Sequence, residues 1–285
     1  MSPQLIIVAG PTAVGKTDYA VGLARQLQTE IVSCDSRQFY REMSIGVARP
    51  SEPQLAAVRH HFIASRSVTD PYNIFDYHHD ALRVVRHLIA TRGSAVAVGG
   101  SGLYIDALLR TPALLPSPTP GLRSRLQAMP IEEKRAQLRL LDPDYYARVD
   151  LRNPVRLQRA LEVCLSAGRP YSAILAEQQQ SPQPLLPTEV RLLSLPPDEL
   201  RRRIDSRVDL MMQQGLIDEV RSLLPFRHLS TLNTVGYREL FDVVDPDGSH
   251  TPLDVAVSQI KLNTWHYARK QNTWMRKYRH LVAAP

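Results

Sequence analysis

The chain has 285 residues, of which 44% are hydrophobic and 22% charged, a composition typical of a soluble globular protein and unlike that of a disordered or fibrous chain. No apolar run approaches membrane-spanning length, the first residues lack the basic segment of a signal peptide, and the only cysteines, Cys34 and Cys164, exclude a disulfide framework and a Cys-rich zinc site. We therefore expect a cytoplasmic protein with no membrane partner, and its formal net charge of +7 favours a polyanionic partner.

A buried parallel strand is predicted over residues 5–9, and a helix over residues 16–28. Between them runs a loop that fits the phosphate-binding pattern G-x-x-x-x-G-K-[ST] at every fixed position, namely Gly10, Pro11, Thr12, Ala13, Val14, Gly15, Lys16 and Thr17. Backbone N–H groups of such a loop close around phosphate oxygens, and the helix N-terminus adds the positive end of a dipole. Lys16 can reach an outer phosphate, and the Thr17 hydroxyl can hold Mg²⁺. The motif indicates a diphosphate or triphosphate without saying which molecule carries it.

The next predicted strand, residues 30–36, ends in Asp35 and Ser36. Ligands of open parallel sheets bind at the carboxyl ends of the strands, so both residues are expected at the mouth of a site beside the phosphate loop. A loop-capping role for Asp35 is the simpler structural alternative.

Two pairs of adjacent histidines raise the question of a metal site. His60 and His61 fall in a strand predicted over residues 60–64, which points neighbours to opposite faces, and His78 and His79 fall in a helix predicted over residues 74–91. Because no further cluster of metal-type residues completes a site, we interpret both pairs as structural.

Another buried strand, residues 95–98, runs into Gly99-Gly100-Ser101-Gly102 and a helix over residues 103–110. It does not end in the aspartate that an ordinary ATPase uses to hold Mg²⁺. A Gly-rich turn with a hydroxyl permits close approach of a ligand, but its composition is equally consistent with a tight strand-to-helix turn.

From about residue 121 to residue 180, after a run of prolines, the pattern is helical throughout. Asn153-Pro154 supplies an N-cap and a first-turn proline for one helix, whose inner face is Leu157, Leu161, Cys164 and Leu165. Arg156 and Arg159 share another face, which is either simply solvated or suited to phosphate contacts. We therefore expect a P-loop-type parallel α/β core, residues 1–112 and 188–285, with helices on both faces of the sheet and an all-helical insertion, residues 113–187.

The chain returns to the core through a strand predicted over residues 190–195 and a helix that begins at Pro197. The second half of the last helix, which spans about residues 252–279, carries many basic and no acidic residues. Interleaved with them are Trp265, Tyr267, Trp274 and Tyr278. Basic and aromatic residues together are typical of nucleic-acid binding, although part of the aromatic set must pack the helix onto the core.

Eight segments, taken in order, resemble the tRNA dimethylallyltransferase (tRNA isopentenyltransferase) family over nearly the whole chain. They are GPTAVGKT at 10–17, SCDS at 33–36, GVARP at 46–50, VGGSGLY at 98–104, NPVRLQRALEV at 153–163, GLIDEV at 215–220, VGYREL at 235–240 and RKQNTWMR at 269–276. The chain departs from the family at Ser101, where Thr is usual, at Val14, where Ser is usual, and at Pro154, which follows Asn153 without an intervening acidic residue. The cysteine-rich zinc finger of the eukaryotic relatives is absent.

The resemblance implies transfer of a dimethylallyl group from dimethylallyl diphosphate to N6 of the adenosine 3′ of the tRNA anticodon, with Mg²⁺ as cofactor. Asp35 would take the amine proton, Lys16 and Arg207 would face the leaving diphosphate, and Thr17 and Ser101 would complete the catalytic set. We expect a monomer that binds the anticodon stem-loop. The expected tRNA contacts are Asp35, Ser36, Arg37, Gln38, Ser101, Arg123, Val155, Arg156, Leu157, Gln158, Arg159, Asn233, Gly236, Tyr237, Arg238, Arg269, Lys270, Gln271, Trp274 and Arg276.

The residues themselves leave two other functions open. A P-loop small-molecule kinase, with Asp35 activating a hydroxyl, explains the loop but not the helical insertion or the basic last helix. An RNA-binding module with a vestigial nucleotide site explains the basic helix but not the intact Lys16, Thr17 and Asp35. A GTPase switch is disfavoured because the guanine motif N-K-x-D is absent.

Overall fold

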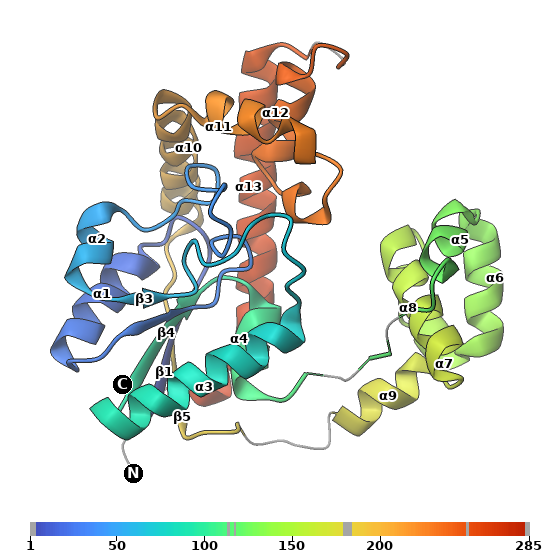
Figure 1. Cartoon of the computed structure of the whole chain (residues 1–285), viewed down its shortest axis with the longest axis horizontal. Helices are drawn as coiled ribbons and strands as arrows, with labels where there is room; N and C mark the ends of the chain where they lie inside the picture. Colours follow the sequence, from blue (N-terminus) through green and yellow to red (C-terminus); the bar gives the residue numbers. More distant parts are fainter. Residues whose placement is uncertain (1–3, 113–114, 117, 179–183, 249–250, 283–285) are drawn as a thin grey trace. The chain divides into compact units, whose positions relative to one another are not determined.

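A computed structural model of the chain describes residues 4–112, 115–116, 118–178, 184–248 and 251–282 (Figure 1). The chain divides into two compact units, which are described separately below. The first comprises Met1–Leu109 and Leu185–Pro285, and the second comprises Arg110–Pro184.

The first unit is built on a five-stranded sheet in the order β3-β2-β4-β1-β5, and every pairing in it is parallel. Its strands are β1 (Leu5–Ala9), β2 (Ile31–Ser33), β3 (His60–His61), β4 (Ala95–Gly99) and β5 (Thr188–Leu192). The chain crosses back between parallel strands through α1 (Lys16–Gln26), α2 (Glu52–Ala57) and α3 (Ile74–Arg92), and α4 (Gly102–Leu109) follows β4. The predicted parallel α/β architecture is confirmed.

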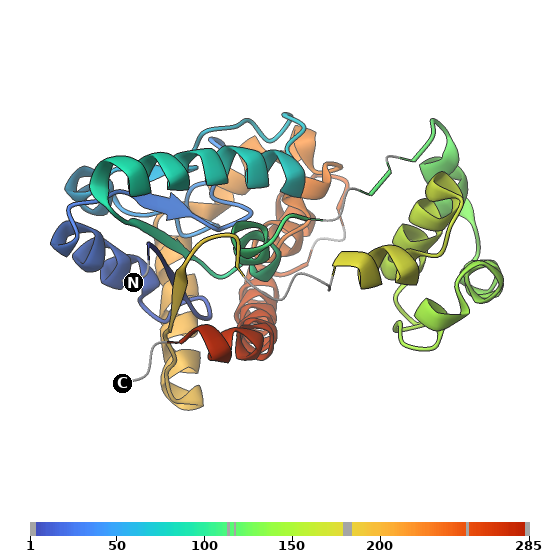
Figure 2. The ribbon, with the colours of Figure 1, turned by 90° about the horizontal axis from the view of Figure 1, so that it is seen from below.

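Helices cover both faces of this sheet because successive strand residues point to opposite sides. Ile6 and Val8 of β1 pack with Leu23 of α1 in one cluster. Leu5 and Ile7 belong to the larger cluster on the other face, which includes residues of α3 and α4. Figure 2 shows the long helix α3 lying along the sheet.

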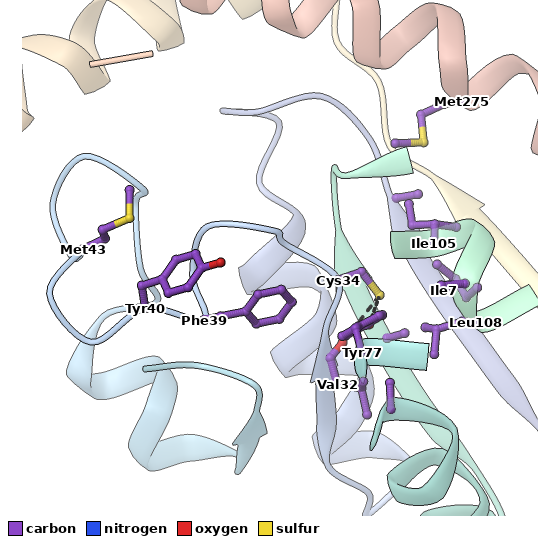
Figure 3. Close-up of a cluster of buried hydrophobic side chains, with 14 of the residues drawn as sticks. Ile7, Val32, Cys34, Phe39, Tyr40, Met43, Tyr77, Ile105, Leu108 and Met275 are labelled. Atoms are coloured by element: carbon purple, nitrogen blue, oxygen red, sulfur yellow. Dashed lines mark hydrogen bonds between the residues drawn. The ribbon is translucent and has the colours of Figure 1, made fainter. Parts of the chain in front are cut away.

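A buried aromatic group fills the space under the end of β2 (Figure 3). The Phe39 and Tyr77 ring centroids lie 5.5 Å apart, and the Tyr77 hydroxyl donates to the Ser33 carbonyl oxygen at 3.0 Å. The same hydroxyl lies 3.3 Å from the Cys34 sulfur, and burial raises the pKa of that thiol to about 12. Cys34 is thus a fully buried packing residue at the strand end that precedes Asp35.

Local signals explain where the crossover helices begin and end. The Asn73 side chain accepts from the backbone N–H of Phe75 at 2.8 Å and of Asp76 at 3.3 Å, and the Asp76 carboxylate accepts from the Asn73 N–H, so α3 starts with a capping box. It ends at Gly93, whose φ of 79° is left-handed. The sequence analysis overlooked α2, which the capping-box pair Ser51 and Gln54 could have revealed.

The strand predicted over residues 60–64 is shorter in the structure. It ends at His61 because Phe62 and Ala64 have φ of 65° and 49°, which breaks the extended conformation. Its two histidines have structural partners nearby: His61 Nε2 lies 2.6 Å from Glu30 Oε2, and His60 Nδ1 lies 2.8 Å from the Val58 carbonyl oxygen.

The C-terminal part of the first unit is helical. It contains α10 (Pro197–Gln213), α11 (Leu216–Ser222), the 3₁₀ turns η1 (Leu224–Phe226) and η2 (Ser230–Leu232), α12 (Tyr237–Val244) and α13 (Leu253–Met275). The helix predicted to reach residue 279 ends at Met275 and tightens into the 3₁₀ helix η3 (Arg276–Leu281). Among the described residues, none of the helices combines the length and apolar character that crossing a bilayer requires.

The second unit consists of helices in its described residues, namely α5 (Leu122–Ala128), α6 (Ile131–Leu141), α7 (Pro143–Tyr146), α8 (Pro154–Ala167) and α9 (Tyr171–Gln178). As the Asn153-Pro154 pair predicts, the Asn153 side chain caps α8 by accepting from the Arg156 N–H at 3.1 Å. Leu126, Leu138 and Leu161 form its core with other apolar residues.

The chain leaves and re-enters the first unit at one point. The backbone N–H of Leu185 donates to the carbonyl oxygen of Leu109 at 2.9 Å, which joins the last residue of α4 to the segment that leads into β5. One hydrogen bond thus spans the base of the whole excursion from residue 110 to residue 184.

Candidate active site

The phosphate loop lies between β1 and α1, as predicted, and its two fixed glycines each meet a backbone requirement. Gly15 caps α1 with a φ of 96°, which other residues adopt only with strain. A Cβ on Gly10 would lie 2.6 Å from the carbonyl oxygen of Leu193, just beyond β5. The close approach of the loop to the neighbouring strand therefore excludes a side chain at Gly10.

Lys16 is folded against its own loop, and its ammonium group donates to the Pro11 carbonyl oxygen at 2.6 Å. Burial lowers the pKa of Lys16 to about 8; the nearby Asp35 carboxylate opposes this shift and Arg207 adds to it. A diphosphate bound beside this buried amine would raise its pKa again, because a nearby negative charge stabilises the ammonium form.

Asp35 and Ser101 project from the ends of adjacent strands, β2 and β4. Asp35 Oδ1 accepts from the Arg37 N–H at 2.9 Å, which fixes the carboxylate in a tight turn. Ser101 Oγ accepts from the Ser36 N–H at 3.2 Å and lies 3.3 Å from the Ser36 hydroxyl. Ser101 therefore ties the Gly-rich turn to the turn that carries Asp35.

Gln271 connects the same Gly-rich turn to the phosphate loop. Its amide oxygen accepts from the Thr12 N–H and its amide nitrogen donates to the Gly100 carbonyl oxygen, both at 2.9 Å. The glycines of the turn leave room for α13: a Cβ on Gly100 would lie 2.2 Å from Gln271 Nε2, and one on Gly102 would lie 2.1 Å from Trp274 Nε1. The turn therefore packs against the last helix, and its Gly99 and Gly100 also line the cavity described next.

The phosphate loop, the turn that carries Asp35 and part of the Gly-rich turn line one cavity of about 750 Å³ within the first unit. Lys16, Thr17 and Asp35 line it together with Arg207 of α10, so two cations and a carboxylate face one space. Burial lowers the pKa of Arg207, and Asp18 opposes the shift. Apolar side chains complete the wall, among them Ile45, Val47, Val208, Met211, Val235 and Ile260.

Many of the expected RNA contacts also line this cavity: Ser36, Arg37, Gln38, Asn233, Gly236, Arg238 and Gln271. Arg37 donates to the Thr231 carbonyl oxygen at 2.7 Å, and Arg238 pairs with Glu239 at 2.8 Å. Tyr237 is a correction, because its side chain is fully buried and its hydroxyl donates to Glu219 at 2.6 Å. It supports the cavity from behind instead of facing RNA.

The basic end of α13 is exposed. Arg269, Lys270 and Arg276 are all exposed, and Trp274 is 40% exposed with its indole N–H donating to the Tyr278 hydroxyl at 3.2 Å. The Lys277 ammonium group lies 3.9 Å from the Trp274 ring centroid. This surface combines positive charge with an aromatic face, as the sequence pattern indicates.

In the second unit, three of the expected RNA contacts converge on one carboxylate that the sequence analysis overlooked. Glu162 is 3% exposed and accepts from Arg123 Nε at 3.2 Å, from Arg159 at 3.3 Å and from Gln158 at 3.1 Å. Burial acts to raise the pKa of Glu162, but these hydrogen bonds outweigh it and lower the pKa. The guanidinium groups of Arg123 and Arg159 are therefore held in place.

Arg156 and Val155 are exposed on the first turn of α8. Leu157 is a second correction: its side chain is fully buried in the helical core, where the periodicity of α8 had placed it, and offers no surface to RNA. Leu157 was expected to contact RNA only because it lies in the family motif, whereas the helical periodicity already predicted that its side chain is buried.

Two further residues of the cavity region were missed. Tyr267 lines the cavity one turn before Gln271, and burial raises the pKa of its hydroxyl. Glu219 lies behind the cavity wall and binds three consecutive backbone N–H groups. The spacing of Tyr267, Gln271 and Trp274 along one helix face could have identified the first. Glu219 lies in the matched segment GLIDEV, but no local signal indicates its contacts with residues 44–46.

Among the described residues, no cluster of three or more His, Cys, Asp or Glu side chains could by itself hold a metal ion. The donor set at the phosphate loop is instead the Thr17 hydroxyl beside a space suited to phosphate oxygens. Mg²⁺ fits such a site, because it commonly binds through one or two protein oxygens plus substrate phosphates and water.

Comparison with known proteins identifies the family. The model of the family described as IPP transferase matches residues 38–278. A tRNA dimethylallyltransferase from Christiangramia forsetii is 43% identical over 97% of this chain and 91% of the relative. A tRNA dimethylallyltransferase 1 from Bacteroides thetaiotaomicron is 40% identical over 96% of this chain and 89% of the relative.

Solved structures agree. The full-length tRNA isopentenylpyrophosphate transferase from Bacillus halodurans is 30% identical, with a TM-score of 0.69 over 99% of this chain and 89% of that chain. A eukaryotic dimethylallyltransferase acting on tRNA shares the fold at 22% identity, with a TM-score of 0.80 over 96% of this chain and 70% of that chain. The resemblance found in the sequence is confirmed, and the chain belongs to the IPP transferase family.

Proposed function

We propose that this protein transfers a dimethylallyl group from dimethylallyl diphosphate to N6 of the adenosine 3′ of the tRNA anticodon, releasing diphosphate. The observation that carries the proposal is the single cavity in which the phosphate loop, Asp35 and Arg207 meet. The relatives named tRNA dimethylallyltransferase support it over nearly the full chain.

The reaction replaces a carbon–oxygen bond of the donor by a carbon–nitrogen bond to N6. The nitrogen must lose one proton as it becomes substituted, and we assign Asp35 to accept it. Asp18 also lines the cavity, but Asp35 is the carboxylate that follows the end of β2. The Arg37 N–H that binds Asp35 Oδ1 orients the carboxylate for this role. Ser101 acts through the Ser36 turn and so positions Asp35 indirectly.

The leaving diphosphate carries the bonding electron pair of the broken bond, so negative charge grows on it during the reaction. Lys16 and Arg207 supply positive charge on the same cavity wall, and the backbone N–H groups of residues 10–17 add further donors. Burial makes both cations more effective, because their interaction with the diphosphate is less screened by water.

Mg²⁺ would be held by the Thr17 hydroxyl and the donor phosphates, where it neutralises negative charge on the diphosphate. The phosphate loop would bind this diphosphate through residues 10–17 with no nucleotide consumed. Thr17 and Lys16 adjoin one another at the start of α1, so the hydroxyl and the ammonium group serve the same phosphates.

The anticodon stem-loop is the proposed RNA partner. Exposed Arg156 on α8, the Glu162-bound arginines, and the basic aromatic end of α13 support backbone contacts. We propose that the protein acts in the cytoplasm as a monomer, which agrees with its two free, buried cysteines.

The test is incubation of the protein and Mg²⁺ with labelled dimethylallyl diphosphate and unmodified tRNA, without ATP. Label should appear in RNA, but not in a tRNA whose target adenosine is replaced by guanosine, which lacks the N6 amine. A parallel incubation contains ATP and a small alcohol; transfer of phosphate to the alcohol there, with no label in RNA in the first incubation, would support the kinase function instead.

A further inference from the structure

One carboxylate accepts four hydrogen bonds, three of them from a loop that lines the cavity. Glu219 of α11 accepts from the backbone N–H groups of Ser44 at 3.0 Å and Ile45 at 2.8 Å through Oε2. Through Oε1 it accepts from the Gly46 N–H at 3.0 Å and from the Tyr237 hydroxyl at 2.6 Å. Capture of three consecutive N–H groups fixes the backbone path of this segment.

Tyr237 makes the arrangement close-fitting. A Cβ on Gly46 would lie 2.6 Å from the Tyr237 ring, so only glycine allows the loop to pass the ring at this point. The segments GVARP, GLIDEV and VGYREL, which the phosphate chemistry leaves without a role, therefore meet in one structure through Gly46, Glu219 and Tyr237.

Two other side chains hold the rest of the same loop. The Gln38 amide donates to the carbonyl oxygens of Val47 at 3.2 Å and Ala48 at 3.0 Å. The Arg49 guanidinium group donates to three carbonyl oxygens of the preceding turn, at Tyr40, Arg41 and Met43. The segment takes no part in the sheet. Its shape is held by these side chains together with two backbone hydrogen bonds of its own, from the Ala48 N–H to the Ile45 carbonyl oxygen at 2.9 Å and from the Arg49 N–H to the Ser44 carbonyl oxygen at 3.1 Å.

This loop forms a wall of the cavity. Ile45, Gly46 and Val47 line it beside Val208 and Met211 of α10, and the same helix carries Arg207. An apolar wall next to the phosphate-binding cations suits a small hydrocarbon joined to a diphosphate. Burial of the hydrocarbon is favourable, and a wall that is already shaped avoids the free-energy cost of ordering the loop on binding.

We infer that Glu219 is a positioning residue that sets the loop 44–48 as the wall for the hydrocarbon of the prenyl donor. The inference rests on the proposed function for the identity of the donor. It assigns the loop to the donor and not to the RNA.

The test uses three variants of the full chain. Glu219→Gln keeps the shape of the side chain but places an NH₂ group against two hydrogen-bond donors. Tyr237→Phe removes one of the four hydrogen bonds and keeps the ring. Asp218→Asn is the control, since Asp218 is the adjacent exposed carboxylate and pairs with Arg221 outside the wall.

Binding of dimethylallyl diphosphate and of inorganic diphosphate, each with Mg²⁺, is measured by calorimetry. We expect Glu219→Gln to raise the Kd for dimethylallyl diphosphate by about tenfold or more, since the loss of a hydrogen bond to a charged group costs about a factor of ten or more. The Kd for inorganic diphosphate should rise by less than about twofold. Tyr237→Phe should show a smaller loss in the same direction, and Asp218→Asn should match the wild type. Hydrogen exchange at residues 44–46 should rise in the order Asp218→Asn, Tyr237→Phe, Glu219→Gln.

Equal weakening of both ligands would overturn the inference, as would a change confined to the KM for tRNA. If Glu219→Gln does not fold, Tyr237→Phe is the remaining test. Unchanged donor binding together with unchanged hydrogen exchange in Tyr237→Phe would then refute the positioning role of Glu219. Failure of the proposed function is a separate result: the wild type would bind both ligands but transfer no label to RNA.

Discussion

Gln271 of α13 hydrogen-bonds to Thr12 of the phosphate loop across 259 positions of sequence, and its other amide atom holds Gly100. The last helix thus fixes the phosphate loop relative to the Gly-rich turn after β4. A side chain in the motif expected to contact RNA is, in the structure, 6% exposed and occupied with the backbone of the active site.

Replacing Gln271 by Leu should therefore impair donor binding and stability more than RNA binding. The buried Gly100 carbonyl oxygen and the partly buried Thr12 N–H lose their partner, and an unsatisfied buried group costs about 1–3 kcal/mol. Melting temperature and the KM for dimethylallyl diphosphate report the effect. Thr273→Ala, an exposed change on the same helix, is the control, and equal behaviour of the two variants would refute the positioning role.

Deprotonation of Lys16 should lower kcat/KM for dimethylallyl diphosphate at alkaline pH. Its pKa is lowered to about 8, so the free enzyme loses this positive charge as the pH rises through that value. kcat/KM for dimethylallyl diphosphate, which reports the free enzyme, should fall above about pH 8. Lys16→Arg remains charged throughout and should be slower but free of this fall. Persistence of the same alkaline fall in Lys16→Arg would assign it to another group.

Asp35→Asn should abolish most of the proton acceptance without removing the turn, because an amide oxygen can still accept from the Arg37 N–H. Loss of a general base costs about 10²–10⁴ in rate. Single-turnover rates should fall by that factor while the Kd for tRNA stays within about twofold. A near-normal rate would show that Asp35 only caps the turn.

Arg156 and Arg207 should separate RNA binding from chemistry. Arg156 is exposed on α8, and losing one phosphate contact should lower the salt slope of tRNA binding by roughly 0.7–0.9. Arg207→Ala should leave that slope unchanged and raise the reaction barrier by roughly 2.7–4 kcal/mol, as for the loss of a donor to a developing anion. Binding at several salt concentrations, measured beside single-turnover rates, tests both. An unchanged slope in Arg156→Ala would make that face a solvated surface.

Glu162 should make the second unit sensitive to acid. Its pKa is lowered in the folded protein, so its stabilisation is complete above the ordinary glutamate pKa and is lost as the pH falls through the lower folded value. The hydrogen-exchange protection factors of α8, corrected for the intrinsic pH dependence of exchange, should fall below about pH 4 in the wild type. Glu162→Gln should be less protected at neutral pH and show little further change in acid. Parallel pH profiles for the two proteins would contradict this account.

The elements that local chemistry specifies could be predicted from the sequence. The phosphate loop, the Asn153 cap of α8 and the strand that leads to Asp35 all follow from short-range patterns. These patterns also indicate a parallel sheet, in which ligands bind at the carboxyl ends of the strands, and the structure has this sheet.

What could not be predicted depends on contacts between distant segments. Glu219 accepts a hydrogen bond from the Ser44 N–H, although the two residues are 175 positions apart in the sequence. The residue spacing within either segment does not predict this contact. The strand at His60 ends early because of left-handed backbone at Phe62, where the residue type gives no warning. Leu157 shows the opposite case, in which periodicity placed the side chain in the core and a motif assignment overrode it.

The hydrogen bond between Leu109 and Leu185 has a consequence for how the chain can change. Because the two ends of the excursion lie one hydrogen bond apart, a tight turn of a few residues is enough to close the core without it. A chain in which a short turn replaces residues 110–184 should therefore keep the strand order of the sheet. The two units can thus change in sequence and length independently of one another.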